Sequence, residues 1–208
     1  MTISAGLEPF DYDKTIVTVL KKEGVSINDC LNSLQENLYI CTSRLELAQL
    51  EMEMIGRSMR ETILKRAIEP IRSDYDFILI DCPPQLSILT INALACSDYV
   101  VIPVKTDYLA YRGVELLMES ISEVKQLINP KLSVMGVVAT MFEMRVNDDK
   151  EILQALQEKY TVIGIVKKLA IAKKGVYDGR SVGEQSPKND VATEYDKVSE
   201  FIIQNGGN

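Results

Sequence analysis

The ten residues from Tyr75 to Pro84, YDFILIDCPP, constrain the fold of this chain more than any other stretch. Residues 77–80 form an unbroken apolar run that is too short for a helix and rich in branched side chains, which predicts a buried strand. A strand without polar alternation is typical of a parallel sheet covered on both faces. The run ends at Asp81, and the two prolines that follow exclude both a continued ladder and an immediate helix. A carboxylate is therefore predicted where a central strand stops, at the edge where open α/β sheets bind ligands.

The carboxylate of Asp81 has two interpretations at this point. In nucleoside-triphosphate hydrolases, an Asp in this place helps to hold the Mg²⁺ that bridges the phosphates. The plainer interpretation is a strand end whose Asp caps the next helix. These residues alone favour neither.

The rest of the chain alternates predicted strands with predicted helices. The predicted strands are residues 37–42, 77–80, 99–104, 132–140 and 162–166. The predicted helices are residues 14–22, 26–34, 45–54, 59–71, 88–95, 113–128, 148–159 and 190–204. This order predicts an α/β fold, with a mostly parallel sheet and helices on both faces. Because 208 residues without repeats or linkers suit one sizeable core, we expect a single domain over residues 1–208.

Composition excludes several classes of site. The chain has no His, and its four cysteines (Cys30, Cys41, Cys82, Cys96) lack CxxC spacing, which argues against zinc, haem and a His-based triad. No apolar run reaches the length of a bilayer span and no leader opens the chain, so we expect a cytoplasmic protein without membrane association. The net charge of −7 argues against uniform attraction to nucleic acid but leaves room for a local basic patch.

The stretch from Tyr75 to Gly113 closely resembles the ParA/Soj family of partition ATPases, part of the deviant Walker class that includes MinD. It continues as LSILTINALACSD at residues 86–98 and YVVIPVKTDY at residues 99–108. The matching stretch of the family is the Walker B strand, its Pro-Pro exit, a short helix and the next core strand. Similarity extends more loosely from Ser4 to the C-terminus. The resemblance implies a P-loop NTPase-like fold, ATP and Mg²⁺ as cofactors, Asp81 as a catalytic carboxylate linked indirectly to Mg²⁺, and Pro83 among the nucleotide-binding residues.

The glycine-rich loop that cradles phosphates and ends in Lys and Ser or Thr is missing. No Gly-Lys dipeptide occurs, and the nearest imitation, GVYDGRS at residues 175–181, has three intervening residues and Arg180 in place of Lys. We interpret it as a surface loop. In the family the phosphate loop precedes the region that matches Met1, so a βα unit and a following strand, about 40 residues, are expected to be absent. A truncated ATPase and a natural relative without catalysis both remain open, and neither is expected to hydrolyse ATP efficiently alone.

Two further segments bear on function. TMFEMR at residues 140–145 resembles a family stretch that approaches the nucleotide base, which implies nucleotide binding by Met141 and Phe142; an equal alternative places both in the core. Residues 167–188 hold six cations against two carboxylates. These cations are Lys167, Lys168, Lys173, Lys174, Arg180 and Lys188. Their region matches the family's nonspecific DNA surface, so we expect contacts to DNA phosphates, the alternative being a solvated face.

The acidic terminal helix differs from MinD's basic membrane helix and is predicted to dock on the domain.

The resemblance implies a function in plasmid or chromosome segregation. In this family ATP drives dimerisation, the dimer binds DNA nonspecifically on the nucleoid, and a centromere-bound ParB-type partner stimulates hydrolysis. The alternative is a non-catalytic, ParA-like interaction protein that binds a full-length partner or the centromere-binding protein. Loss of the central phosphate-loop strand would leave residues 77–80 open. We therefore expect this segment to pair with residues 37–42 or with a second molecule, or the protein to self-associate.

Overall fold

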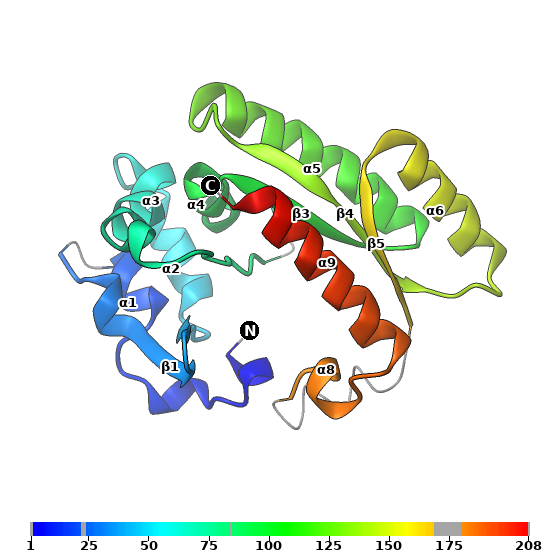
Figure 1. Ribbon diagram of the computed structural model, residues 1–208. Helices are drawn as coiled ribbons and strands as arrows, with labels where there is room; N and C mark the ends of the chain where they lie inside the picture. Colours follow the sequence, from blue (N-terminus) through cyan, green and yellow to red (C-terminus); the bar gives the residue numbers. More distant parts are fainter. Residues whose placement is uncertain (1, 22–23, 84, 169–179, 208) are drawn as a thin grey trace. The chain divides into compact units, whose positions relative to one another are not determined.

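The computed structural model describes residues 2–21, 24–83, 85–168 and 180–207 of the chain. The chain forms two compact units, Met1–Cys96 and Ser97–Asn208, which are coloured from blue to green and from green to red in Figure 1. The expectation of one domain over residues 1–208 stays a prediction.

The first unit consists of short helices and one β-hairpin. Its helices and strands are α1 (Ile16–Lys21), β1 (Leu31–Gln35), β2 (Leu38–Cys41), α2 (Leu47–Met54), α3 (Ile63–Ile68) and α4 (Ile88–Cys96). Short 3₁₀ helices cover Ile3–Ala5, Pro9–Asp11, Ile27–Cys30, Arg60–Thr62 and Glu69–Asp74. Leu50 and Met54 of α2 lie one turn apart and are fully buried in an apolar cluster with side chains of the other helices.

The β1–β2 hairpin corrects the prediction of a helix over residues 26–34. The Ser26 hydroxyl accepts a hydrogen bond from the Asn28 amide, but it caps only one 3₁₀ turn, which ends at Cys30. The chain then pairs antiparallel with β2, with Leu31 opposite Cys41, through a turn in which Asn37 has a φ of 60°. Strand pairing overrides the local helical pattern here.

The prediction of a strand over residues 77–80 is wrong for this chain. The segment belongs to none of the strands in the described residues, and Figure 1 draws it as a loop. Pairing with residues 37–42 does not occur in the described part of the chain, because the sheet that contains β2 has only two strands, β1 and β2. An apolar run becomes a strand only when a neighbouring strand offers backbone carbonyls and amides that can form hydrogen bonds with those of the run.

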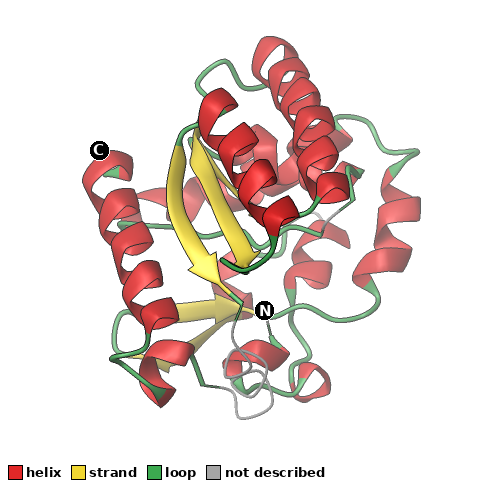
Figure 2. Cartoon of the chain, turned by 90° about the vertical axis from the view of Figure 1, so that its right-hand side faces the viewer, coloured by secondary structure: helices red, strands yellow, loops and turns green. Residues whose placement is uncertain are grey.

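The second unit is a three-stranded parallel sheet in the order β3–β4–β5. Its elements are β3 (Tyr99–Lys105), α5 (Tyr108–Leu127), β4 (Ser133–Phe142), α6 (Asn147–Lys159), β5 (Val162–Lys167), α8 (Val182–Gln185) and α9 (Asp190–Gly206). The crossover helices α5 and α6 lie on one face of the sheet, and α9 lies on the other (Figures 1 and 2). The prediction of an α/β fold with a parallel sheet and helices on both faces is thus confirmed.

The terminal helix α9 docks onto this sheet, as the sequence predicted. Val191 and Val198 are buried against β4 and β5. Gly164 of β5 permits this approach, because a Cβ atom there would lie 2.4 Å from Cγ2 of Val198. The carboxylate of Glu194 accepts a hydrogen bond from the amide of Ile165 at 3.0 Å. Helix α9 thus also supplies an acceptor for a backbone amide of β5. No helix among the described residues is long and apolar enough to cross a membrane.

Candidate functional site

The carboxyl ends of the three parallel strands lie at one edge of the sheet, where α/β folds bind ligands. Hydrogen bonds join the strands beyond their regular pairing. The amide of Thr106 donates to the carbonyl of Thr140 at 3.2 Å, and the amide of Lys168 donates to the carbonyl of Phe142 at 3.1 Å. The edge is therefore a continuous set of three connected strand ends.

One carboxylate holds the ends of β3 and β4 together. Asp149, in the first turn of α6, accepts a hydrogen bond from the Thr106 hydroxyl at 2.9 Å and one from the Glu143 amide at 2.8 Å. Thr106 is only 3% exposed, so its hydroxyl has little access to water. Sequence reasoning missed this arrangement, because Thr106 and Asp149 are 43 residues apart and neither belongs to a recognisable motif.

The same edge contains the start of α5, which sequence reasoning placed too late. The side chain of Asp107 accepts a hydrogen bond from the Ala110 amide at 2.8 Å, so the helix begins at Tyr108 rather than at Gly113. This backbone amide, followed by Lys105, lowers the pKa of Asp107. The signal was available, because an Asp just before an amphipathic stretch is a common N-cap.

Met141 and Phe142, the predicted nucleotide-binding residues, lie at the end of β4. Met141 is 43% exposed and has a left-handed φ of 58°, a conformation that costs about 1–2 kcal/mol for a residue with a Cβ. Phe142 is half-buried. The side chain of Met141 is thus outside the core, and strained backbone of this kind is concentrated at functional edges.

Asp81 and Pro83, the other predicted site residues, lie in the first unit between residues 77–80 and α4. Both are exposed. The described residues contain no group of three or more His, Cys, Asp or Glu side chains placed to hold a metal ion. An exposed carboxylate nevertheless fits Mg²⁺, which keeps several waters and is usually bound through one or two carboxylates plus substrate phosphates.

The predicted basic surface is only partly within the described residues. Lys173 and Lys174 lie outside them, whereas Arg180 and Lys188 are exposed. Lys167 pairs with Asp190 at 2.7 Å and lowers the pKa of that carboxyl. Lys168 pairs with Glu143 at 2.5 Å, and this hydrogen bond raises the pKa of Lys168. Exposed ion pairs of this kind contribute little to stability, so neither lysine is strongly held by its carboxylate.

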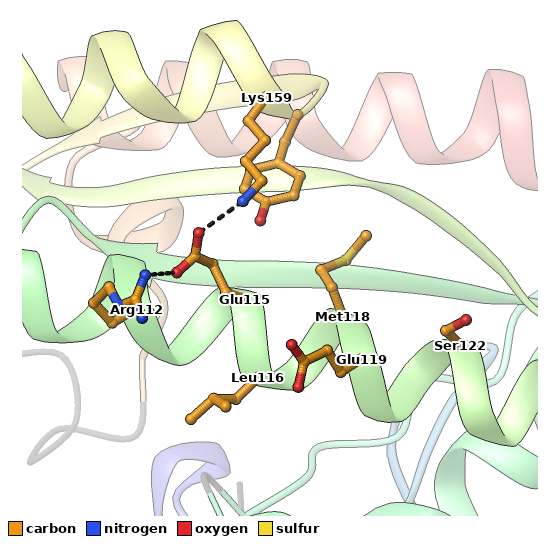
Figure 3. A pocket seen from close by; sticks show the side chains of 8 residues that line it. Arg112, Glu115, Leu116, Met118, Glu119, Ser122 and Lys159 are labelled. Carbon is orange, nitrogen blue, oxygen red and sulfur yellow. Dashed lines mark hydrogen bonds and ion pairs between the residues drawn. The ribbon is translucent and has the colours of Figure 1, made fainter.

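A surface pocket on α5 and the end of α6 contains none of the predicted site residues (Figure 3). Its lining residues are Arg112, Glu115, Leu116, Met118, Glu119, Ser122, Lys159 and Tyr160. Glu115 accepts a hydrogen bond from Lys159 at 2.7 Å and also pairs with Arg112. These cations, Lys159 first, lower the pKa of Glu115. The two positive charges are therefore already partnered within the pocket.

Comparison with known proteins places the chain in a family. A family model described as an AAA domain matches residues 1–134. The chromosome-partitioning ATPase Soj of Treponema pallidum is 30% identical over 182 residues, which cover 82% of this chain and 69% of Soj. The sporulation initiation inhibitor protein Soj of Bacillus subtilis is 35% identical over 159 residues, 76% of this chain and 63% of that protein.

A solved structure agrees with these matches. Cobyrinic acid a,c-diamide synthase from Mycobacterium smegmatis, with bound ADP and magnesium, superposes with a TM-score of 0.72 at 29% identity. The match covers 86% of this chain and 72% of the synthase chain. The chain spans about half the length of the first curated relatives it matches, proteins of Mycobacterium tuberculosis of which 51% is covered. With its matching motif, its parallel sheet and these relatives, the chain belongs to the ParA/Soj family of partition ATPases.

Proposed function

We propose that this chain acts in DNA partition, in plasmid or chromosome segregation, as the ATPase domain of a ParA/Soj-type protein. The observation that carries the proposal is the Asp81 segment. An apolar run, a carboxylate and a Pro-Pro exit occur together within the region that the family model matches. Asp81 is exposed, as a residue that receives a ligand must be.

The nucleotide-binding role is assigned to two groups of residues. Asp81 would hold Mg²⁺ through water, with Pro83 beside the nucleotide, while Met141 and Phe142 would approach the base. When bound, Mg²⁺ neutralises the charge on the phosphates of ATP. Asp149 fixes the Glu143 amide, and through it the backbone that follows Met141. Support comes from the synthase of M. smegmatis, which is related in sequence and whose structure contains ADP and magnesium.

The DNA-binding role is assigned to Lys167, Lys168, Lys173, Lys174, Arg180 and Lys188, and the partner to a centromere-binding ParB-type protein. We propose contacts to phosphates only, as on the nucleoid, because phosphate contacts carry no sequence information. Replacing Lys173, Lys174 and Arg180 with Ala should flatten the salt dependence of DNA binding by about 0.9 in logarithmic slope per lost contact. Replacing the exposed Lys65, Lys125 and Lys131 with Ala is the matched control, since it removes the same number of positive charges. An unchanged slope in the first variant would contradict this assignment.

A second candidate function is a non-catalytic, ParA-like interaction protein. The absence of any Gly-Lys dipeptide favours it, because the phosphate loop supplies the main electrostatic clamp on ATP. Assays of ATP hydrolysis with DNA and a ParB-type protein separate the two candidates. Hydrolysis by this chain supports the ATPase. A chain that does not hydrolyse ATP but changes the rate of a full-length ParA-type ATPase supports the interaction protein.

A further inference from the structure

We propose that two DNA-binding lysines at the end of β5 are autoinhibited, because carboxylates of the same chain compete with DNA phosphates for them. The lysines are Lys167 and Lys168, and their carboxylates are Asp190 and Glu143, respectively. This inference rests on the DNA-binding role proposed above. The partners lie 23 and 25 positions apart in the sequence, so a count of charges over residues 167–188 does not reveal the pairs.

The register of the sheet places Glu143 beside Lys168. Phe142 of β4 is opposite Lys167 of β5, and the Lys168 amide donates a hydrogen bond to the Phe142 carbonyl at 3.1 Å. The next residue along each strand end therefore meets its counterpart, and the Lys168 ammonium lies 2.5 Å from a carboxylate oxygen of Glu143. Asp149 also fixes Glu143, because it accepts a hydrogen bond from the Glu143 amide at 2.8 Å. The first pair is thus positioned by the backbone of the sheet.

The docking of α9 places Asp190 beside Lys167. Asp190 is the first residue of α9, and Val191, which follows it, is 1% exposed and packs in the core of the second unit. The Asp190 carboxylate accepts a hydrogen bond from the Lys167 ammonium at 2.7 Å. The helix is capped by Asn189 instead, whose side chain accepts a hydrogen bond from the Val191 amide at 2.8 Å. The Asp190 side chain is therefore not required as the N-cap and serves the ion pair.

Both ion pairs are open to water, so a polyanion can reach them. The side chains of Lys168 and Glu143 are 56% and 46% exposed, and those of Lys167 and Asp190 are 46% and 71% exposed. Each pair has no net charge, so its lysine offers DNA little attraction until the carboxylate is displaced. Exposed ion pairs are weak and screened by salt, so displacement costs little. The pairs therefore lower the affinity for DNA without preventing binding.

Neutralising both carboxylates tests the competition. The test variant combines Glu143→Gln with Asp190→Asn, which removes two negative charges and keeps the size of each side chain. The matched control combines Asp148→Asn with Asp196→Asn, since these exposed carboxylates lie in α6 and α9 and form no ion pair with the described residues. Fluorescence anisotropy with a labelled DNA duplex of mixed sequence measures affinity at about 50 mM salt, where phosphate contacts are strong. Circular dichroism checks that all variants are folded.

The test variant should bind DNA about two- to twentyfold more tightly than the control variant, which is the combined effect of releasing two exposed ion pairs. This gain should disappear when Lys167 and Lys168 are both replaced with Ala, because no pair is then left to release. Equal affinities of the test and control variants, or a gain that persists without the two lysines, would overturn the inference alone. Absence of DNA binding in the wild-type chain and in both variants would overturn the DNA-binding role as well.

Discussion

Replacement of Asp149 tests the connected strand edge at a single side chain. In Asp149→Ala, the hydroxyl of Thr106 and the amide of Glu143 both lose their acceptor. A hydrogen bond to a charged group contributes about 1.5–3 kcal/mol, and we take the lower end because this site is partly exposed to water. Two such bonds give an expected loss of about 3 kcal/mol in the free energy of unfolding.

Asp148→Ala is the matched control. Asp148 lies beside Asp149 in the first turn of α6 and is exposed, so both replacements remove the same favourable charge from the helix N-terminus. The control should lose no more than about 0.5–1 kcal/mol, by the usual size of that effect. Asp149→Asn keeps an acceptor without its charge and should fall between the two alanine variants.

The assay combines urea unfolding with hydrogen exchange. Because the chain has no Trp, unfolding is followed by far-ultraviolet circular dichroism. Exchange of the Glu143 amide reports the edge itself, and it should accelerate in Asp149→Ala but not in Asp148→Ala. Equal losses of stability in the two alanine variants, with unchanged exchange at Glu143, would refute the role given to Asp149.

Three further predictions concern stability. The side chain of Asn92 is 1% exposed and forms hydrogen bonds with the backbone of α3 and of the 3₁₀ turn before it, so Asn92→Ala should lower the free energy of unfolding in urea by about 2–4 kcal/mol. The control is Asn205→Ala, because this exposed side chain donates a hydrogen bond only to the preceding turn of its own helix, and it should change that free energy by no more than about 0.5 kcal/mol. Gly164→Ala should lower the free energy of unfolding by about 1–3 kcal/mol, because the added Cβ would lie 2.4 Å from a side-chain atom of α9. Gly113→Ala, where the added Cβ meets open space, should stabilise α5 by about 0.5–1 kcal/mol, and equal effects of the two variants would contradict the close approach of α9 to β5. Because the pKa of Asp107 is lowered, its charge stabilises the fold above the ordinary pKa of Asp, about 4, and this contribution is lost as pH falls through the lowered value. The difference in stability between wild type and Asp107→Asn should therefore vanish between about pH 5 and pH 2. A difference that does not depend on pH would contradict this prediction.

Much of the second unit could be predicted from sequence, because its apolar runs have neighbours in the same chain. Residues 99–104, 132–140 and 162–166 form β3, β4 and β5 with small changes at their ends. Residues 148–159 and 190–204 likewise form α6 and α9. In these elements, the local pattern and the available tertiary partner favour the same structure.

The first unit shows where sequence patterns fail. Residues 77–80 form an unbroken apolar run that predicts a strand, yet the described structure supplies no partner and no strand forms. Residues 31–34 have a helical pattern, yet they pair with β2. In both cases the outcome depends on which backbone is available as a neighbour, and this information is absent from a local pattern.

The candidate site divides in the same way. Asp81, Pro83, Met141 and Phe142 were found because each belongs to a contiguous motif, and their roles remain proposals. Asp149 was missed because its role arises only when α6 brings it to Thr106, 43 residues earlier. Contacts between distant segments are fixed by packing and cannot be read from one stretch.

A nucleotide titration tests the central claim most directly. Calorimetry would compare this chain with a chimera in which a βα unit containing a glycine-rich phosphate loop precedes it. Because the sequence contains no Gly-Lys dipeptide of the kind that ends a phosphate-cradling loop, we expect the chain alone to show no saturable ATP binding below about 1 mM, and we expect the chimera to bind ATP with Mg²⁺. The Asp81→Ala chimera should lose the dependence on Mg²⁺. Micromolar binding by the chain alone, or a folded chimera that binds no ATP, would contradict the account.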